Sequence, residues 1–120
     1  MAERLLFISW GEPVRGREER GLEVFNEAID FYGRLEQEGR IEKFDVVLLA
    51  PNGRLEGYIE LHGSAEQLVA VREDDEYRRI LAEAALVVNA LSVVEGATNE
   101  GIAREMAVYQ AAISKVPQSA

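Results

Sequence analysis

Apolar and polar positions change their period several times along the chain, and each change marks the boundary of an expected element. Leu5 to Trp10 is a nearly continuous apolar run followed by Gly11 and Pro13, which predicts a largely buried first strand. From Arg17 the apolar residues recur at spacings of three and four, which predicts an amphipathic helix that ends near Gly39. The first third of the chain is therefore expected to form a strand followed by a long helix.

Two further strands are predicted in the middle of the chain, over Phe44 to Ala50 and over about Leu55 to His62. Between them lies Pro51-Asn52-Gly53. The Asn-Gly pair favours the positive φ angles that a tight primed turn needs. We therefore expect these two strands to form a β-hairpin.

Helical patterns return after this hairpin. Ser64 and Gln67 have the spacing of a capping box, in which each side chain bonds the backbone N–H of the other residue. The acidic pair Asp74-Asp75 favours a kink and a restart, because Asp is a good N-cap and a poor residue inside a helix. The β-branched, apolar run from Val87 to Val94 then predicts the fourth strand.

A last helix is expected over about residues 99–116, opened by Glu100 and ended by Pro117. Its apolar residues recur at spacings of four and three, which is typical of a helix packed along its whole length. This stripe consists of Ile102, Met106, Tyr109, Ile113 and Val116.

The predicted order is β-α-β-β-α-β followed by a helix, and we expect residues 1–120 to form a single α+β domain. Right-handed crossovers then predict a ferredoxin-like, four-stranded antiparallel sheet with both crossover helices on one face. The strands are apolar on both faces, as the first strand shows, where Leu5 and Phe7 alternate with Leu6 and Ile8. Because contiguous apolar patches rarely stay exposed, we expect a homodimer in which a second copy covers the other face. The C-terminal helix is the alternative cover.

Several of these features occur together over about residues 4–98: the first strand, the helix ending at Glu38-Gly39-Arg40, the Pro51-Asn52-Gly53 turn, the Gly57 to Leu61 strand and the capped Ser64 helix. In this order they resemble the dimeric α/β-barrel superfamily. That superfamily includes stress-responsive barrel proteins, YCII-related proteins, EthD-like proteins and small antibiotic-biosynthesis monooxygenases.

The resemblance implies two sheets that close into a barrel across a dimer, with a cleft for a small, often aromatic or apolar, molecule. YCII-related enzymes are credited with a His–Asp pair, whereas the first strand of this chain has no histidine. The resemblance rests on topology rather than on a catalytic motif, and a fold by itself does not carry a function.

Composition narrows the classes of function. With 22 acidic and 13 basic residues the net charge is −9, and this field repels nucleic acids and anionic membranes. The chain has no cysteine, which excludes disulfides, thiolate nucleophiles and cysteine-based metal sites and fits a reducing compartment. No apolar stretch approaches the ~20 residues of a spanning helix. We therefore expect a cytoplasmic protein with neither nucleic acid nor membrane as its partner.

His62 is the only histidine, and histidine is the side chain best suited to proton transfer near neutral pH. Strand alternation places it on the same face as Tyr58 and Glu60. If that face lines a cleft, Glu60 and His62 can act together as a general base. The alternative is an inert histidine at a strand end. These two residues offer fewer than the three ligands of a usual catalytic zinc, so the sequence predicts no metal and no cofactor.

Ligand-binding candidates are Trp10 at the end of the first strand, Tyr58, and Asn89 in the expected fourth strand. Binding pockets combine apolar walls with a few polar groups, and these three residues supply both. Simple packing is the alternative for Trp10. Three hypotheses follow: a homodimer that binds a small apolar or aromatic molecule in a cleft between sheet and helices, a cofactor-free monooxygenase or isomerase that uses His62 and Glu60, or a structural or regulatory interaction module.

Overall fold

The computed structural model describes residues 1–117 and 119. Its elements are β1 (Arg4–Trp10), α1 (Glu18–Gln37), β2 (Lys43–Leu48), β3 (Gly57–Gly63), α2 (Ala65–Glu73), α3 (Asp75–Val87), β4 (Ser92–Ala97) and α4 (Glu100–Ile113). The strands form one sheet in the order β2-β3-β1-β4, and every neighbouring pair is antiparallel. This is the predicted α+β, ferredoxin-like arrangement. Within the described residues, no helix combines the length and the apolar character that crossing a bilayer requires.

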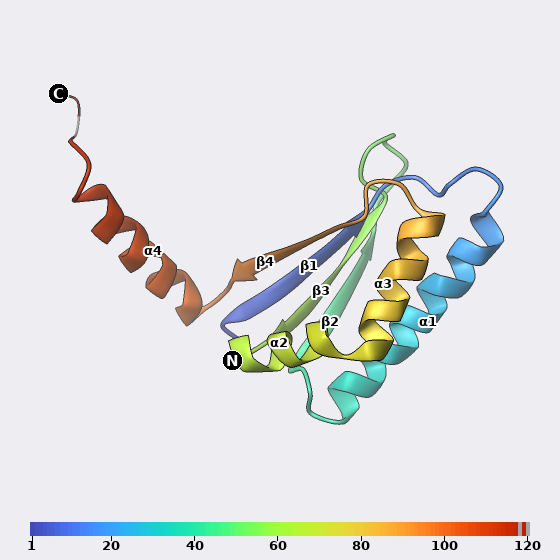
Figure 1. The fold of residues 1–120 in the computed structure, drawn as a ribbon, viewed down its shortest axis with the longest axis horizontal. Coiled ribbons are helices and arrows are strands. Elements are labelled where there is room, and N and C mark those ends of the chain that lie inside the picture. The colour runs from blue at the N-terminus through green and yellow to red at the C-terminus, as the bar shows by residue number, and fades with distance from the viewer. Residues whose placement is uncertain (118, 120) are drawn as a thin grey trace.

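Helices α1, α2 and α3 lie on one face of the sheet, as predicted (Figure 1). The hydrophobic core fills the space between the two layers, and Leu6 of β1 and Leu61 of β3 are fully buried in it. Burying one such side chain stabilises the fold by about 1.5–3 kcal/mol. From the helices the same core receives Ala28, Phe31, Leu35, Tyr77 and Ile80.

Both predicted helix starts after β3 are confirmed. At α2 the Ser64 hydroxyl accepts from the Gln67 N–H at 3.1 Å, and the Gln67 side-chain oxygen accepts from the Ser64 N–H at 2.9 Å. At α3 the Asp74 carboxylate accepts from the N–H groups of Glu76 and Tyr77, at 2.8 and 3.2 Å. Asp74 has extended backbone angles, so it separates the two helices while it caps the second one.

The connection between β2 and β3 differs from the predicted tight turn. β2 ends at Leu48 and β3 begins at Gly57, so residues 49–56 join the two strands as a longer loop. Gly53 does adopt the expected positive φ, at 77°. The Asn52 side chain, however, bonds backbone groups on both sides of itself at 2.6–3.0 Å. Such local side-chain bonds favour a loop over continued strand pairing.

The predicted strand over Val87 to Val94 is wrong in its bounds. α3 continues through Val87, and β4 begins at Ser92. Val87 extends the three-and-four spacing of the apolar residues of α3 and is buried. Packing of the helix therefore overrides the β propensity of a valine. As a consequence Asn89, which the sequence placed in the strand, lies exposed in the loop before β4.

Helix α4 projects away from the rest of the molecule (Figure 1). Its N-terminal end is fixed where the Ala2 carbonyl accepts hydrogen bonds from the side chains of Thr98 and Asn99, at 3.1 and 2.6 Å. Farther along, Met106 and Tyr109 are 49% and 61% exposed. The alternative in which the C-terminal helix covers the second face of its own sheet is therefore wrong.

The second face of the sheet, opposite α1, α2 and α3, is called the open face below. The strand registers place on it residues from all four strands, and several of these are apolar. The apolar members are Leu5, Phe7, Val47, Tyr58 and Val94, of which Val94 is 53% exposed. The predicted two-sided apolar character of the strands is thus present in the fold.

Candidate functional site

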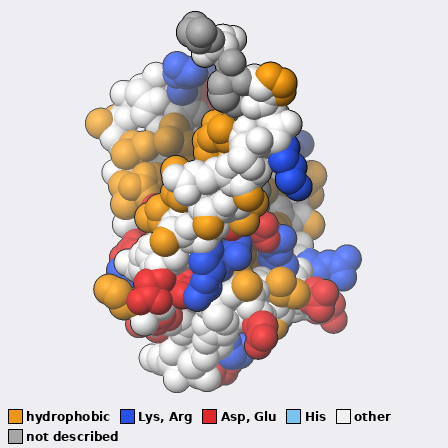
Figure 2. Space-filling model, turned by 90° about the vertical axis from the view of Figure 1, so that its left-hand side faces the viewer, with side chains coloured by type: hydrophobic (Ala, Val, Ile, Leu, Met, Phe, Trp, Pro, Cys, Tyr) orange, Lys and Arg blue, Asp and Glu red, His pale blue; other side chains and the backbone are white. Residues whose placement is uncertain are grey.

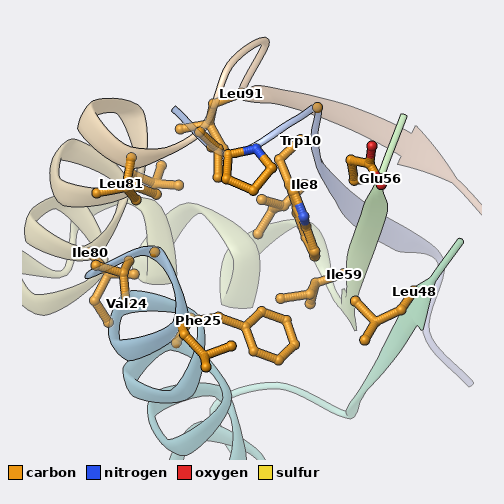
Figure 3. Close-up of a pocket in the computed structure, with 18 of the residues that line it drawn as sticks. Ile8, Trp10, Val24, Phe25, Leu48, Glu56, Ile59, Ile80, Leu81 and Leu91 are labelled. Carbon is orange, nitrogen blue, oxygen red and sulfur yellow. The ribbon is translucent and has the colours of Figure 1, made fainter. Parts of the chain in front are cut away.

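A cavity of about 380 Å³ lies between the sheet and the helices α1 and α3 (Figure 3). This volume falls within the ~300–1,000 Å³ of typical small-molecule sites. Leu48, at the end of β2, also lines it and is 67% exposed, which places it where the cavity meets the surface. Other apolar lining residues are Ile8, Val24, Phe25, Ile59, Ile80, Leu81 and Leu91.

Trp10 extends into this cavity from the end of β1 (Figure 3). Its ring contacts the Phe25 ring edge-on, with centroids 5.9 Å apart and an interplanar angle of 64°. Edge-to-face contacts of this kind are favourable beyond their buried area. The structure therefore places the predicted Trp10 on the cavity wall, and its contact with a ligand stays a prediction.

Polar groups at the cavity are few, and two of them are carboxylates. Glu56 lies near Trp10 (Figure 3), and its backbone N–H donates to the Trp10 carbonyl at 2.9 Å. Glu18 also borders the cavity, and its Oε1 accepts from the N–H of Gly16 at 2.9 Å. The apolar walls with these two carboxylates favour a neutral or cationic guest over an anion.

Tyr32 of α1 also borders the cavity and is almost fully buried. Burial raises the pKa of its phenol, and the neighbouring Tyr77 raises it further. The hydroxyl therefore stays protonated at neutral pH and can donate a hydrogen bond. Tyr32 and Phe25 belong to the apolar residues whose spacings of three and four after Arg17 predict the helix α1. A ring on a core-facing stripe gives no sign of the empty space beside it.

A second cluster of polar groups lies on the open face. Glu60 and His62 share that face of β3, as predicted, and the β2–β3 register places Asp45 directly opposite Glu60. His62 Nε2 lies 3.2 Å from Asp45 Oδ2 and 3.2 Å from Glu60 Oε1. His62 is 9% exposed, and its Nε2 has no hydrogen-bond partner despite these distances. Neither carboxylate oxygen is therefore aligned with the imidazole nitrogen.

The predicted site residues thus occupy three separate places. Trp10 lines the cavity on the helix side of the sheet, whereas Glu60, His62 and Tyr58 lie on the open face. The Tyr58 ring contacts the Phe7 ring in a tilted arrangement, with centroids 4.9 Å apart. Asn89 lies outside both places, in its exposed loop. A ligand in the cavity cannot contact the Glu60–His62 pair, because the sheet separates them.

Asp45 is the residue of this cluster that sequence reasoning missed. It precedes Glu60 by fifteen positions, and residues 49–56 join the two strands. Its place opposite Glu60 follows from the pairing register. The predicted Asn52-Gly53 turn implies the same register, because six residues separate the turn from Asp45 on one side and from Glu60 on the other. Alternation along β2 puts Lys43, Asp45 and Val47 on a common face, so alternation and the turn together are the signal that could have found Asp45.

No protein-family model and no curated protein sequence matches this chain. Solved structures match its fold. A dimeric protein of unknown function with a ferredoxin-like fold from Bacteroides fragilis has a TM-score of 0.59 at 14% identity, over 79% of this chain and 96% of that one. A putative antibiotic biosynthesis monooxygenase from Chloroflexus aurantiacus has a TM-score of 0.55 at 12% identity, over 80% and 93%.

A third similar structure is SnoaB, a cofactor-independent oxygenase from Streptomyces nogalater. Its TM-score is 0.51 at 12% identity, over 82% of this chain and 93% of that chain. Identities this low show a common fold and leave the chemistry open. These similar structures therefore support the ferredoxin-like architecture of this chain. One of them is described as dimeric and another as an oxygenase.

Proposed function

We propose that this protein is a homodimeric binding protein for a small apolar or aromatic molecule, held between the sheet and the helices α1 and α3. The cavity there is the observation that supports the proposal: its volume is about 380 Å³ and its walls are mostly apolar. A well-formed apolar pocket with a few polar groups is the usual form of a small-molecule site. The cytoplasmic location and the finer kinship with YCII-related or EthD-like proteins stay predictions.

The cavity lining indicates the chemical class of the ligand. Trp10, Phe25 and Tyr32 offer aromatic surface for stacking or edge contacts. Glu18 and Glu56 are acidic, and the whole chain carries a net charge of −9. An anionic ligand would be repelled by both the site and the overall field. We therefore expect a neutral or weakly basic ring compound.

The open face supports the dimer. It carries apolar side chains from β1, β2, β3 and β4, and α4 projects from the molecule (Figure 1) with exposed apolar side chains of its own. Figure 2, viewed from the α4 side, shows hydrophobic side chains gathered in patches on this part of the molecule. Surfaces of this kind mark interaction sites, and a symmetric dimer is the commonest way to cover them. Two of the structural neighbours are themselves described as dimeric.

A fluorescence titration tests the binding site. Trp10 is the only tryptophan, so its emission reports on the cavity. The probe is N-phenyl-1-naphthylamine, a neutral aromatic dye. We expect bound dye to quench Trp10 by energy transfer, and we expect Ala84→Phe, which adds a ring at a cavity-lining position of α3, to weaken dye binding at least about tenfold.

The matched control is Ala85→Phe, on the same helix but at an exposed position outside the cavity lining. It should bind the dye as the wild type does. Equal loss of binding in both variants, or equal retention in both, would show that the dye binds elsewhere and would contradict the proposed site. Thermal unfolding of both variants by circular dichroism establishes that each is folded.

A cofactor-free oxygenase or isomerase is the second candidate function. It is favoured by the 3.2 Å approach of His62 Nε2 to Glu60 Oε1 and by the oxygenases among the similar structures. Because this pair lies on the open face, its substrate would bind between sheet and partner rather than in the cavity. His62→Ala should abolish any such turnover with little effect on dye binding. Turnover that survives His62→Ala removes the pair from the mechanism.

The third candidate, a structural or regulatory interaction module, is favoured by α4. This helix leaves the body of the molecule and exposes Met106 and Tyr109. A protein with this role alone would bind no dye in the cavity. The same titration with the Ala84→Phe variant therefore separates the module from the binding protein.

A further inference from the structure

The imidazole of His62 is buried and unsatisfied, and two carboxylates surround it. The residue is 9% exposed, and its Nε2 atom is buried without a hydrogen-bond partner. Buried polar atoms are nearly always paired, so an orphaned nitrogen calls for an explanation, and an unseen ion is one of the usual ones. Nε2 is directed into the space between Asp45 and Glu60, with one oxygen of each at 3.2 Å.

The separations of His62 Nε2 from the two carboxylate oxygens fit a shared metal ion. An ion with bonds of about 2.0–2.2 Å at tetrahedral or octahedral angles holds neighbouring ligand atoms about 2.8–3.6 Å apart. Both nitrogen–oxygen distances here are 3.2 Å, and all three ligand atoms lie within 4.8 Å of one another. The oxygens also flank the imidazole nitrogen rather than align with it, which is how ligands around one metal are placed.

Charge favours a cation at the same point. Two carboxylates beside one imidazole make a locally negative site on a face whose other residues are largely apolar. The nearest ammonium is Lys43, whose Nζ lies 3.6 Å from Asp45 Oδ2. The Lys43 side chain is 57% exposed and flexible, so a dication can displace it at small cost. A dication would offset the cost of burying these carboxylates if a second copy covers the open face.

We propose that Asp45, Glu60 and His62 form a binding site for a divalent first-row transition metal, with Zn²⁺ as the best match. One imidazole nitrogen and two carboxylate oxygens suit Zn²⁺, because imidazole disfavours the hard cations Ca²⁺ and Mg²⁺. Three protein ligands leave at least one coordination position for water or for a further ligand. The site is separate from the proposed cavity, which lies on the other side of the sheet.

Isothermal titration calorimetry with Zn²⁺ tests this site. The protein carries no tag and is first dialysed against a chelator to remove bound metal. We expect one Zn²⁺ per chain in the wild type. His62→Gln removes the only imidazole of the chain and should abolish binding. Asp45→Asn and Glu60→Gln should each weaken binding at least about tenfold. Asp30→Asn removes the same charge from an exposed position on α1 and should leave the affinity unchanged.

Two further readouts keep the test decisive. Co²⁺ bound in place of Zn²⁺ should give visible absorption bands that are absent from His62→Gln. Zn²⁺ should also raise the melting temperature of the wild type and of Ala84→Phe, but not of His62→Gln. Because the Asp45 side chain is half exposed, we expect Asp45→Asn to preserve the fold and to test the site if His62→Gln unfolds.

The proposal is overturned if the wild type binds neither Zn²⁺ nor Co²⁺ at micromolar concentration. It is equally overturned if Asp45→Asn retains full affinity, or if Asp30→Asn weakens binding as much as Asp45→Asn does. Failure of the dye to bind in the cavity does not affect this result, so the two proposals stand or fall separately.

Discussion

A Cβ atom on Gly57 would lie 2.7 Å from Cζ2 of Trp10, so the indole occupies the space that any other side chain at this position would fill. The two residues are paired across the β1–β3 ladder. The same Cβ would also meet the Val47 carbonyl oxygen at 2.8 Å. A glycine at the start of β3 is therefore what allows the indole to lie against the sheet and line the cavity.

Gly57→Ala should displace the indole and reshape the cavity. We expect a shift in Trp10 emission, weaker binding of N-phenyl-1-naphthylamine and a loss of about 1–3 kcal/mol in the free energy of unfolding, because the added methyl group overpacks this contact. Tryptophan fluorescence and urea denaturation measure these effects.

The matched control for this variant is Gly33→Ala, inside α1. A Cβ at Gly33 meets no other atom within 4 Å, and alanine is the better helix former, so this change should stabilise the protein by up to about 1 kcal/mol. An unchanged emission spectrum in Gly57→Ala would contradict the proposed role of the glycine.

The open face is expected to be the dimer interface, so a charge at its centre should weaken the dimer. Phe7 lies in the middle of β1 and contacts the Tyr58 ring on that face. Phe7→Glu should raise the dimer dissociation constant at least about tenfold, because an unpaired carboxylate would have to be desolvated on association. Native mass spectrometry and sedimentation velocity measure the oligomeric state.

Leu86→Glu makes a similar apolar-to-acidic change on the helical side of the molecule, where Leu86 is exposed. It should leave the dimer intact. If Leu86→Glu dissociates the dimer and Phe7→Glu does not, the second copy binds the helical layer instead. A wild type that is monomeric at all concentrations would contradict the dimer altogether.

Asp74 should make the stability of the fold depend on pH. Its hydrogen bond with the Arg40 side chain is the main cause that lowers the pKa of the Asp74 carboxyl, and burial opposes the shift. A lowered pKa means that the stabilisation is complete above the ordinary carboxyl value of about 3.9 and is lost as the pH falls through the folded value. Asp74→Asn keeps a good N-cap and removes the charge, so its deficit relative to the wild type should shrink toward low pH.

Asp74→Ala removes the cap as well, and it should cost about 1 kcal/mol more than Asp74→Asn, independent of pH. Urea unfolding measures the free energy of unfolding of the wild type and of both variants between neutral pH and about pH 2.5. This range extends below the ordinary carboxyl pKa of about 3.9. A deficit of Asp74→Asn that is constant across this range would show that the charge of Asp74 does not stabilise the fold.

Local features were predictable wherever they depend only on a few neighbouring residues. The Ser64–Gln67 capping box and the restart at Asp74 depend on hydrogen bonds that span three residues or fewer, so the sequence indicates them directly. Where two local preferences competed, the prediction failed. Val87 has β propensity but continues a helix, and the Asn52-Gly53 pair forms part of a loop instead of a tight turn.

The sequence by itself determined the order of strands and helices, the caps, the apolar character of both sheet faces and the absence of cysteine chemistry, because these follow from periodicity and composition. Only the tertiary structure decided which side chains meet. It brought His62 Nε2 within 3.2 Å of Asp45 and of Glu60, and it placed Trp10 on the wall of a cavity on the opposite side of the sheet. The distances between side chains of different strands and the empty space between layers arise from contacts between segments distant in the chain, and a local pattern carries no record of those contacts.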